Sequence, residues 1–182
     1  MDIKYLNKLL SNEAIVLEKV EQYLNEEIIK EIPQNKEEIK GHLLKADHNL
    51  KFVNDNIPLE YFDWCITGCY YAAYHAAFAL NLVKGYHSKN HDATLCLLIK
   101  EYYRKEITAE EIELLNKFFL DYQEILFYVQ SKQKREDATY STKIKFDKAL
   151  VNELRIKAAL FIDKAKNIIA NTDEEKKDIE GQ

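Results

Sequence analysis

Glycine and proline are scarce in this chain. Its 182 residues include only 4 glycines and 2 prolines. Architectures made of many strands and tight turns need far more of both, because these residues supply the backbone conformations that turns require. The scarcity therefore favours a helical protein with few sharp turns. Hydrophobic residues make up 47% of the chain and charged residues 31%, a balance typical of a globular domain rather than a disordered one.

A surplus of basic residues and a long apolar run are also missing. The formal net charge is −5, whereas a general polyanion-binding protein is usually basic, so any such binding must come from a local basic patch. No stretch approaches the roughly 18 consecutive apolar residues that a membrane span needs. Charged residues also interrupt the opening segment, where a signal peptide would have its apolar region. We therefore expect a protein that makes no membrane contact.

Cysteine is present three times, as Cys65, Cys69 and Cys96. An odd number at these spacings indicates neither a disulfide framework nor a set of metal ligands. The simplest interpretation is a reduced cytoplasmic protein in which the thiols act as small apolar side chains.

Apolar residues recur at helical spacing along most of the chain. The pattern predicts six helices. The first three cover residues 11–32, 36–53 and 59–84, the fourth is capped by Ser88, the fifth begins at Thr108, and the last covers residues 146–170. Thr108 and Glu111 form a capping box, and Gly85 is a natural C-terminal cap for the third helix. No segment alternates as a strand does.

These elements predict an all-α protein, an up-and-down antiparallel bundle of five to six helices. Residues 1–35 are expected to form an N-terminal helical extension, and residues 36–171 the bundle. Residues 172–182 are expected to form a charged, flexible tail.

The third predicted helix carries two rows of small residues at a spacing of four. The rows are Gly68, Ala72 and Ala76, and Cys69, Ala73 and Ala77. Residues four apart stack on one helix face, so these rows allow a neighbouring helix to come close. We expect this helix at the centre of the bundle, with Tyr71 and His75 on another strip. The expected partner of a core His75 is a tyrosine or a backbone carbonyl.

The segment "CYYAAYHAAFALNLVKG" (69–85), followed by "SKNH" (88–91), resembles the HEPN superfamily. Small prokaryotic members have a signature that reads roughly A-Y-Y-A-x-F-H-A-A-x-A-L-L, a glycine, and then S-K-T-H. The segment "KREDATY" (134–140) is similar to their R-x-x-A-x-Y segment, and the resemblance covers about residues 40–170. It implies an up-and-down helical bundle, often dimeric, with a link to RNA or nucleotides. Many members are ribonucleases of toxin–antitoxin and defence systems, and others are inactive relatives or partners of a nucleotidyltransferase.

The ribonuclease motif implied by that resemblance is missing. It consists of an Arg that holds the phosphate, followed four to six residues later by a His that exchanges a proton. This chain has three arginines, Arg104, Arg135 and Arg155, and all five histidines precede them. Tyr140 stands at the fifth place after Arg135, but a tyrosine, which titrates near 10, is a poor general base at neutral pH. The remaining catalytic candidates are His75, Arg135 and Tyr140, joined across helices.

Other residues are candidates for ligand binding. Lys132, Lys134 and Arg135 are expected to lie in a loop that could grip phosphate, with Tyr140 available for stacking, although a plain solvated loop is the alternative. Tyr71, His75 and His91 complete the set of candidates. His87 and His91 are four residues apart, as in a helical metal pair, but Ser88 as a cap would place His87 outside the helix. We therefore expect no metal site and no cofactor.

The leading hypothesis is a cytoplasmic HEPN-like binding or regulatory protein that lacks the usual ribonuclease motif. A homodimer and weak RNA or nucleotide binding are expected. The alternatives are a divergent toxin-type, metal-independent endoribonuclease and a partner of a nucleotidyltransferase.

Overall fold

The computed structural model describes the backbone of residues 1–133 and 147–180, and the side chains of residues 1–123 and 147–172. The described chain is almost entirely helical, which confirms the predicted fold class. Its elements are α1 (Ile3–Ser11), α2 (Glu13–Asn25), β1 (Ile29–Glu31), α3 (Lys36–Asn56), a short 3-10 turn (Ile57–Leu59), α4 (Phe62–Val83), β2 (Tyr86–Ser88), α5 (His91–Tyr102), α6 (Ala109–Gln133) and α7 (Lys148–Glu180).

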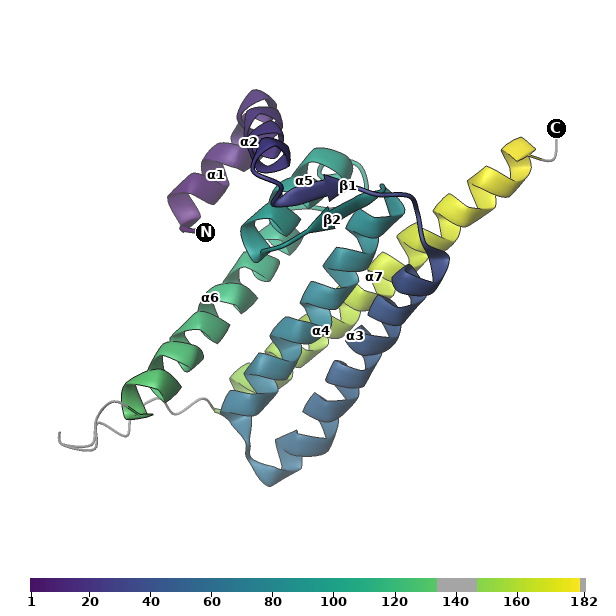
Figure 1. The fold of residues 1–182 in the computed structure, drawn as a ribbon. Coiled ribbons are helices and arrows are strands. Elements are labelled where there is room, and N and C mark those ends of the chain that lie inside the picture. The colour runs from purple at the N-terminus through teal and green to yellow at the C-terminus, as the bar shows by residue number, and fades with distance from the viewer. Residues whose placement is uncertain (134–146, 181–182) are drawn as a thin grey trace.

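Helix α4 is the centre of the bundle. It packs against α3, α5, α6 and α7, and α7 also contacts α3. Figure 1 shows α3, α4, α6 and α7 as the long helices of the bundle, with α1 and α2 at the end where α5 and the two strands lie. None of the helices in the described part of the chain combines the length and apolar character that a membrane span requires.

The rows of small residues on α4 do what their spacing predicted. Ala72, Ala73 and Ala76 are fully buried, as is Cys69. At Gly68 the approach of α3 is so close that an added Cβ atom would lie 2.6 Å from Cγ2 of Val53 and 3.2 Å from Cδ1 of Phe52. The absence of a side chain at this position therefore sets the separation between α3 and α4.

The helix predicted over residues 11–32 is shorter in the structure, where α2 covers only Glu13–Asn25, and α1, which precedes it, was not predicted. Asn12 separates α1 from α2, with an extended backbone and a side-chain oxygen that accepts a hydrogen bond from the N–H of Ala14. The second helix ends at Asn25, and Glu27 adopts a positive φ of 53° that turns the chain into β1. The side chain of Asn12 thus begins α2 as an N-cap, and the positive φ at Glu27 lies in the segment that leads from α2 to β1.

The prediction that Ser88 caps the fourth helix is also wrong. Ser88 lies in β2, which pairs with β1 in antiparallel register, with Ile29 opposite Ser88 and Glu31 opposite Tyr86. Asn90 caps α5 instead, because its side-chain oxygen accepts from the N–H of Ala93 at 2.8 Å. Strands of three residues are too short to produce a recognisable alternation.

Two predicted helix ends are confirmed. Gly85 follows α4 with a φ of 79°, in the left-handed region where glycine carries no steric cost. At the start of α6, the N–H of Thr108 donates to Oε2 of Glu111 at 2.8 Å, and the N–H of Glu111 donates to Oγ1 of Thr108 at 3.4 Å. Glu111 also accepts from Nζ of Lys164 at 2.8 Å, which ties α6 to α7. Helix α7 continues to Glu180, beyond the predicted end at residue 170.

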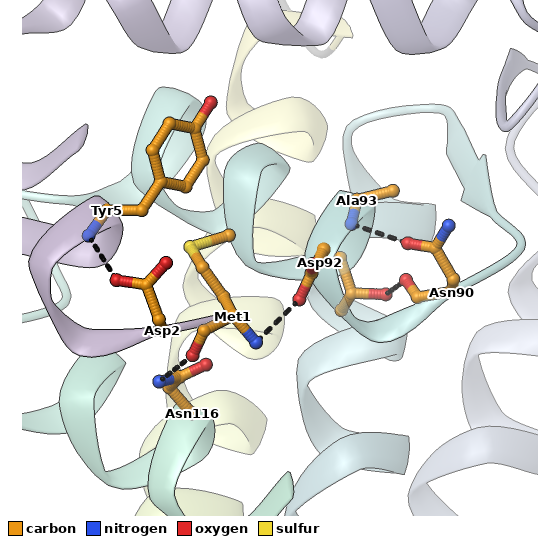
Figure 2. A network of polar contacts seen from close by, with 8 residues as sticks. Met1, Asp2, Tyr5, Asn90, Asp92, Ala93 and Asn116 are labelled. Atoms are coloured by element: carbon orange, nitrogen blue, oxygen red, sulfur yellow. Dashed lines mark hydrogen bonds and ion pairs between the residues drawn. The ribbon is translucent and has the colours of Figure 1, made fainter. Parts of the chain in front are cut away.

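The residues before the bundle are held by polar contacts at their beginning. The Met1 amino nitrogen lies 3.2 Å from Oδ1 of Asp92 on α5, and Asn116 on α6 donates from Nδ2 to the Met1 carbonyl at 3.0 Å. Figure 2 shows Met1 between these two side chains, with Asp2 capping α1 through the N–H of Tyr5. These contacts join α1, α5 and α6 at one end of the molecule.

Two glycine substitutions test the close contact between α3 and α4. Gly68→Ala should lower the free energy of unfolding by about 1–3 kcal/mol, because the new methyl group forces Val53 and Phe52 apart from α4. Gly41→Ala on α3 is the matched control, since nothing lies within 4 Å of its added Cβ atom. This control should raise stability by about 0.5–1 kcal/mol through helix propensity. Urea titrations of both variants measure the two effects, and equal stability of Gly68→Ala and wild type would contradict the close contact.

Candidate functional site

A partly exposed strip on α4 interrupts an otherwise buried helix. Tyr71, Tyr74 and His75 are half-buried, and Phe78 continues the strip as a buried residue. Spacings of three and four place these side chains on one face. Tyr71 contacts α6 through Tyr122, and His75 contacts α3 through His42. The strip therefore lies between α3 and α6.

His75 is paired with another histidine rather than with a tyrosine or a backbone carbonyl. The Nδ1 atoms of His42 and His75 are 3.0 Å apart. The His42 ring stacks on Phe78 with centroids 4.5 Å apart, and the edge of Phe78 meets His87 at 5.2 Å. Histidines from α3 and β2 thus contact one phenylalanine of α4, and its ring restrains the orientation of the His42 ring.

Both paired imidazoles are neutral near pH 7. Burial, with smaller contributions from His42 and Lys45, lowers the pKa of His75 to about 4. Burial also lowers the pKa of His42, against the opposing charge of Glu38. One ring of a neutral pair can donate its Nδ1 proton to the other ring, so a single proton satisfies both Nδ1 atoms.

Two tyrosines form a second pair beside the histidines. The hydroxyls of Tyr71 and Tyr122 are 2.9 Å apart, and Tyr122 stacks on Tyr70 with centroids 4.6 Å apart. Burial and the hydrogen bond with Tyr71 raise the pKa of Tyr122 to about 12. The Tyr122 phenol therefore stays protonated at physiological pH, and the two hydroxyls lie next to flat ring faces.

The predicted candidate His91 lies in the interior instead of on the partly exposed strip. Its ring is stacked flat on Phe119 at 4.1 Å and approaches Tyr70 and Tyr74 at about 6 Å. A cavity of about 10 Å³ adjoins it, and neither ring nitrogen has a hydrogen-bond partner among the residues that the structure describes. Burial lowers the pKa of His91 to about 3, with a smaller effect of the N-terminal ammonium. His91 therefore belongs to the inner part of the same aromatic cluster.

We call this set of side chains the aromatic–histidine cluster. It consists of His42, Tyr70, Tyr71, Tyr74, His75, Phe78, His87, His91, Phe119 and Tyr122. The sequence analysis identified Tyr71, His75 and His91 in it, but missed His42 and Tyr122. Both missed residues stand at core-facing helical positions, Tyr122 three residues after Phe119 and His42 three residues after Ile39, and that spacing was the available signal.

The structure does not bring the other predicted residues to this cluster. Lys132 lies on α6, but its side chain is outside the described residues, and Lys134, Arg135 and Tyr140 lie wholly outside them. The phosphate-binding loop therefore stays a prediction. His87 and His91 are separated, since the first packs on Phe78 and the second on Phe119. Among the side chains described, those of residues 1–123 and 147–172, no three His, Cys, Asp or Glu groups stand close enough together to hold a metal ion.

A comparison with protein families identifies the chain. The model described as HEPN domain matches residues 39–146, more than half of the sequence. The chain belongs to the HEPN family. The matched part of this HEPN protein contains the whole aromatic–histidine cluster, whereas α1, α2 and β1 precede it. A protein of Methanocaldococcus jannaschii that is named a "putative toxin" is 24% identical over 135 residues, which cover 74% of this chain and 83% of that protein.

The buried state of His91 generates a prediction for acid pH. An unfolded chain takes up a proton on this histidine near pH 6.5, whereas the folded protein excludes that proton until about pH 3. Stability should therefore fall as the pH drops below about 6.5, with a contribution from His91 of up to about 1.4 kcal/mol per pH unit. His91→Phe keeps a ring against Phe119 and removes this contribution, so its stability should fall less steeply between pH 6 and pH 4.

Urea titrations at several pH values measure both slopes. His48→Gln is the matched control, because His48 is exposed on α3, and it should leave the slope of the wild type unchanged. Identical pH dependence in His91→Phe and wild type would show that His91 is protonated in the folded protein over this range.

Proposed function

We propose that this HEPN protein is a binding module that recognises RNA or a nucleotide at the partly exposed part of its aromatic–histidine cluster and does not cleave RNA. The observation that carries the proposal is the arrangement of Tyr71, Tyr122, His42 and His75. Their rings come from three helices, are partly exposed, and are oriented by the two pairs of polar contacts described above.

The chemistry of these groups suits a nucleotide. Nucleobases stack on aromatic side chains, and phenol or imidazole N–H and O–H groups can donate hydrogen bonds to phosphate and sugar oxygens. Lys45 is close enough to influence the pKa values of both His42 and His75, and it supplies a positive charge at the same place. Because the chain is acidic overall, such local charge has to provide the attraction to a polyanion. Lys132, Lys134 and Arg135 are proposed to add to it.

The arginines support binding without cleavage. No arginine is followed by a histidine anywhere in the sequence. Arg104 donates a long hydrogen bond of 3.4 Å to the carbonyl of Leu10, and Arg155 donates to the side chain of Asn54 at 3.2 Å. Both are thus engaged with other parts of the molecule, which leaves Arg135 as the candidate for a phosphate contact.

A divergent, metal-independent endoribonuclease of a toxin–antitoxin or defence system is the second candidate function. Two observations favour it: the relative that carries the name of a toxin, and the His42–His75 pair, in which a neutral imidazole could accept a proton. A role as partner of a nucleotidyltransferase is the third candidate, and an adjacent gene for a small nucleotidyltransferase would support it.

Binding and cleavage of labelled single-stranded RNA test the proposal. Wild type should bind RNA with modest affinity and should not cleave it. If three basic residues contact phosphates, the logarithm of the binding constant should fall with the logarithm of the salt concentration with a slope of about −2. Tyr71→Ala should weaken binding by about 1–3 kcal/mol through lost stacking, and Tyr140→Ala should do the same if its ring stacks too. The triple alanine variant of Lys132, Lys134 and Arg135 should flatten the salt slope.

Tyr61→Ala is the matched control for the stacking variants. Tyr61 is 54% exposed at the start of α4 and makes no ring contact with the cluster, so its loss should leave affinity unchanged. Equal affinities in wild type, Tyr71→Ala and the triple variant would overturn the proposal. Cleavage that survives repurification but disappears in His75→Gln or Arg135→Ala would establish the endoribonuclease instead.

A homodimer is proposed as the working form of the protein. Several large apolar side chains are exposed, among them Trp64 at 58% on α4 and Ile156 and Leu160 at 49% and 65% on one face of α7. Burial of such residues against a second copy would remove apolar surface from water. Light scattering of wild type should give the mass of two chains, and Leu160→Asp or Trp64→Asp should shift it towards one if its side chain lies in the interface. A single-chain mass at all concentrations would contradict the dimer.

A further inference from the structure

A groove lies at the end of the bundle where α3 begins and α4 ends. It has a volume of about 260 Å³, and its walls come from the first turns of α3, the last residue of α4 and the part of α7 around Ile169 and Thr172. Figure 1 shows α7 passing the start of α3 and continuing beyond it, so the groove lies where α7 leaves the bundle. None of its lining residues belongs to the aromatic–histidine cluster.

The buried part of the lining is aliphatic. Ile39 and Val83 are only 8% and 6% exposed, and the side chains of Leu43 and Ile169 pack against the same small core cluster. No aromatic ring stands among the described residues that line the groove. An aliphatic lining suits a hydrocarbon chain, whereas a nucleobase is held by stacking on rings. The volume lies just below the lower limit of about 300 Å³ for ordinary small-molecule sites, so the chain must be short.

The exposed rim of the groove carries the charge that would select the head group. Lys36 and Lys40 lie one turn apart on the same face of α3, and Glu37 beside them opposes an anion, so the charged side chains of the lining sum to one positive charge. Lys51 and Lys166 are held in ion pairs, whereas Lys40 has no ion-pair partner among the residues that the structure describes. We propose that the groove binds a small amphipathic anion, a carboxylate on a short aliphatic chain, with its carboxylate at Lys40.

The walls of the groove are fixed by contacts outside the ligand's path. The side-chain amide of Gln34 donates a hydrogen bond to the carbonyl of Val83, which ties the segment before α3 to the end of α4. Nζ of Lys166 lies 2.7 Å from Oδ1 of Asp47, which ties α7 to α3 farther along the groove. A site whose walls are held in place before binding loses less conformational freedom when the ligand enters.

Isothermal titration of the full chain with a series of simple carboxylates tests the proposal. Hexanoate, heptanoate and octanoate should bind at one site per chain, and affinity should rise about fourfold with each added methylene group until the groove is filled. Octylamine, which has the same chain and the opposite charge, should bind more weakly than octanoate. Adenosine monophosphate should not compete with octanoate, because the groove offers no ring on which a base can stack.

Two variants of opposite sign test the charged rim. Lys40→Gln should weaken octanoate binding about threefold, because it removes the facing cation, and Glu37→Gln should strengthen it about twofold, because it removes the opposing anion. Lys51→Gln is the matched control, since Lys51 lies on the same helix but pairs with Asp55 away from the groove, and it should leave the affinity unchanged. All three side chains are exposed, so these changes should not prevent folding.

A variant that fills the groove tests its location. Thr172→Trp places a large ring among the lining residues and should abolish octanoate binding, while circular dichroism should show that the helix content is kept. Absence of octanoate binding by wild type, equal affinity for octanoate and octylamine, or unchanged binding by both Lys40→Gln and Thr172→Trp would overturn the proposal. None of these outcomes bears on RNA binding, because the variants leave the aromatic–histidine cluster intact.

Discussion

The close contact between α3 and α4 is the constraint on which the rest of the site depends. There is no room for a side chain at Gly68. The small, fully buried side chains of Ala72 and Ala76, one and two turns later, also allow a neighbouring helix to approach α4 closely. That separation is what brings His42 within hydrogen-bond distance of His75. With larger residues in these rows, α3 would stand farther from α4, and the same two histidines would face solvent separately.

A continuous series of ring contacts links the exterior of the site to the interior. It runs from His42 and Phe78 through Tyr74 and Tyr70 to His91 and Phe119 under α5. Aromatic rings in contact at such distances restrict one another's orientation. His91, at the buried end of the series, directly precedes Asp92, whose carboxylate contacts the Met1 amino nitrogen. The extension lies outside the matched family region, yet it packs against the helix that carries His91.

The sequence allowed the central helix to be predicted, because small residues at a spacing of four have few other interpretations. The capping box at Thr108 and the glycine cap at Gly85 were equally local signals, and both are confirmed. The break at Asn12 was not predicted, because the predicted helix began at residue 11; the side chain of Asn12 caps the start of α2. Tyr71 and His75 could be identified from the family signature. Their partners Tyr122 and His42 could not, since the register between two helices is set by packing and not by the spacing within either.

The pairing of β1 with β2 joins two segments that the helical pattern treats as separate. Besides the strand register, the N–H of Lys89 donates to the carbonyl of Ile28 at 2.9 Å, and the N–H of Ile32 donates to that of Gly85 at 2.8 Å. The pairing of residues 28–32 with residues 85–89 therefore closes a loop of the chain, and this loop contains α3 and α4. Opening this loop would release the entry to α3 and the exit from α4 together, so we expect the paired segments to unfold locally as one unit. The position of His87 beside Phe78 then depends on the chain that precedes α3 as much as on the chain that follows α4.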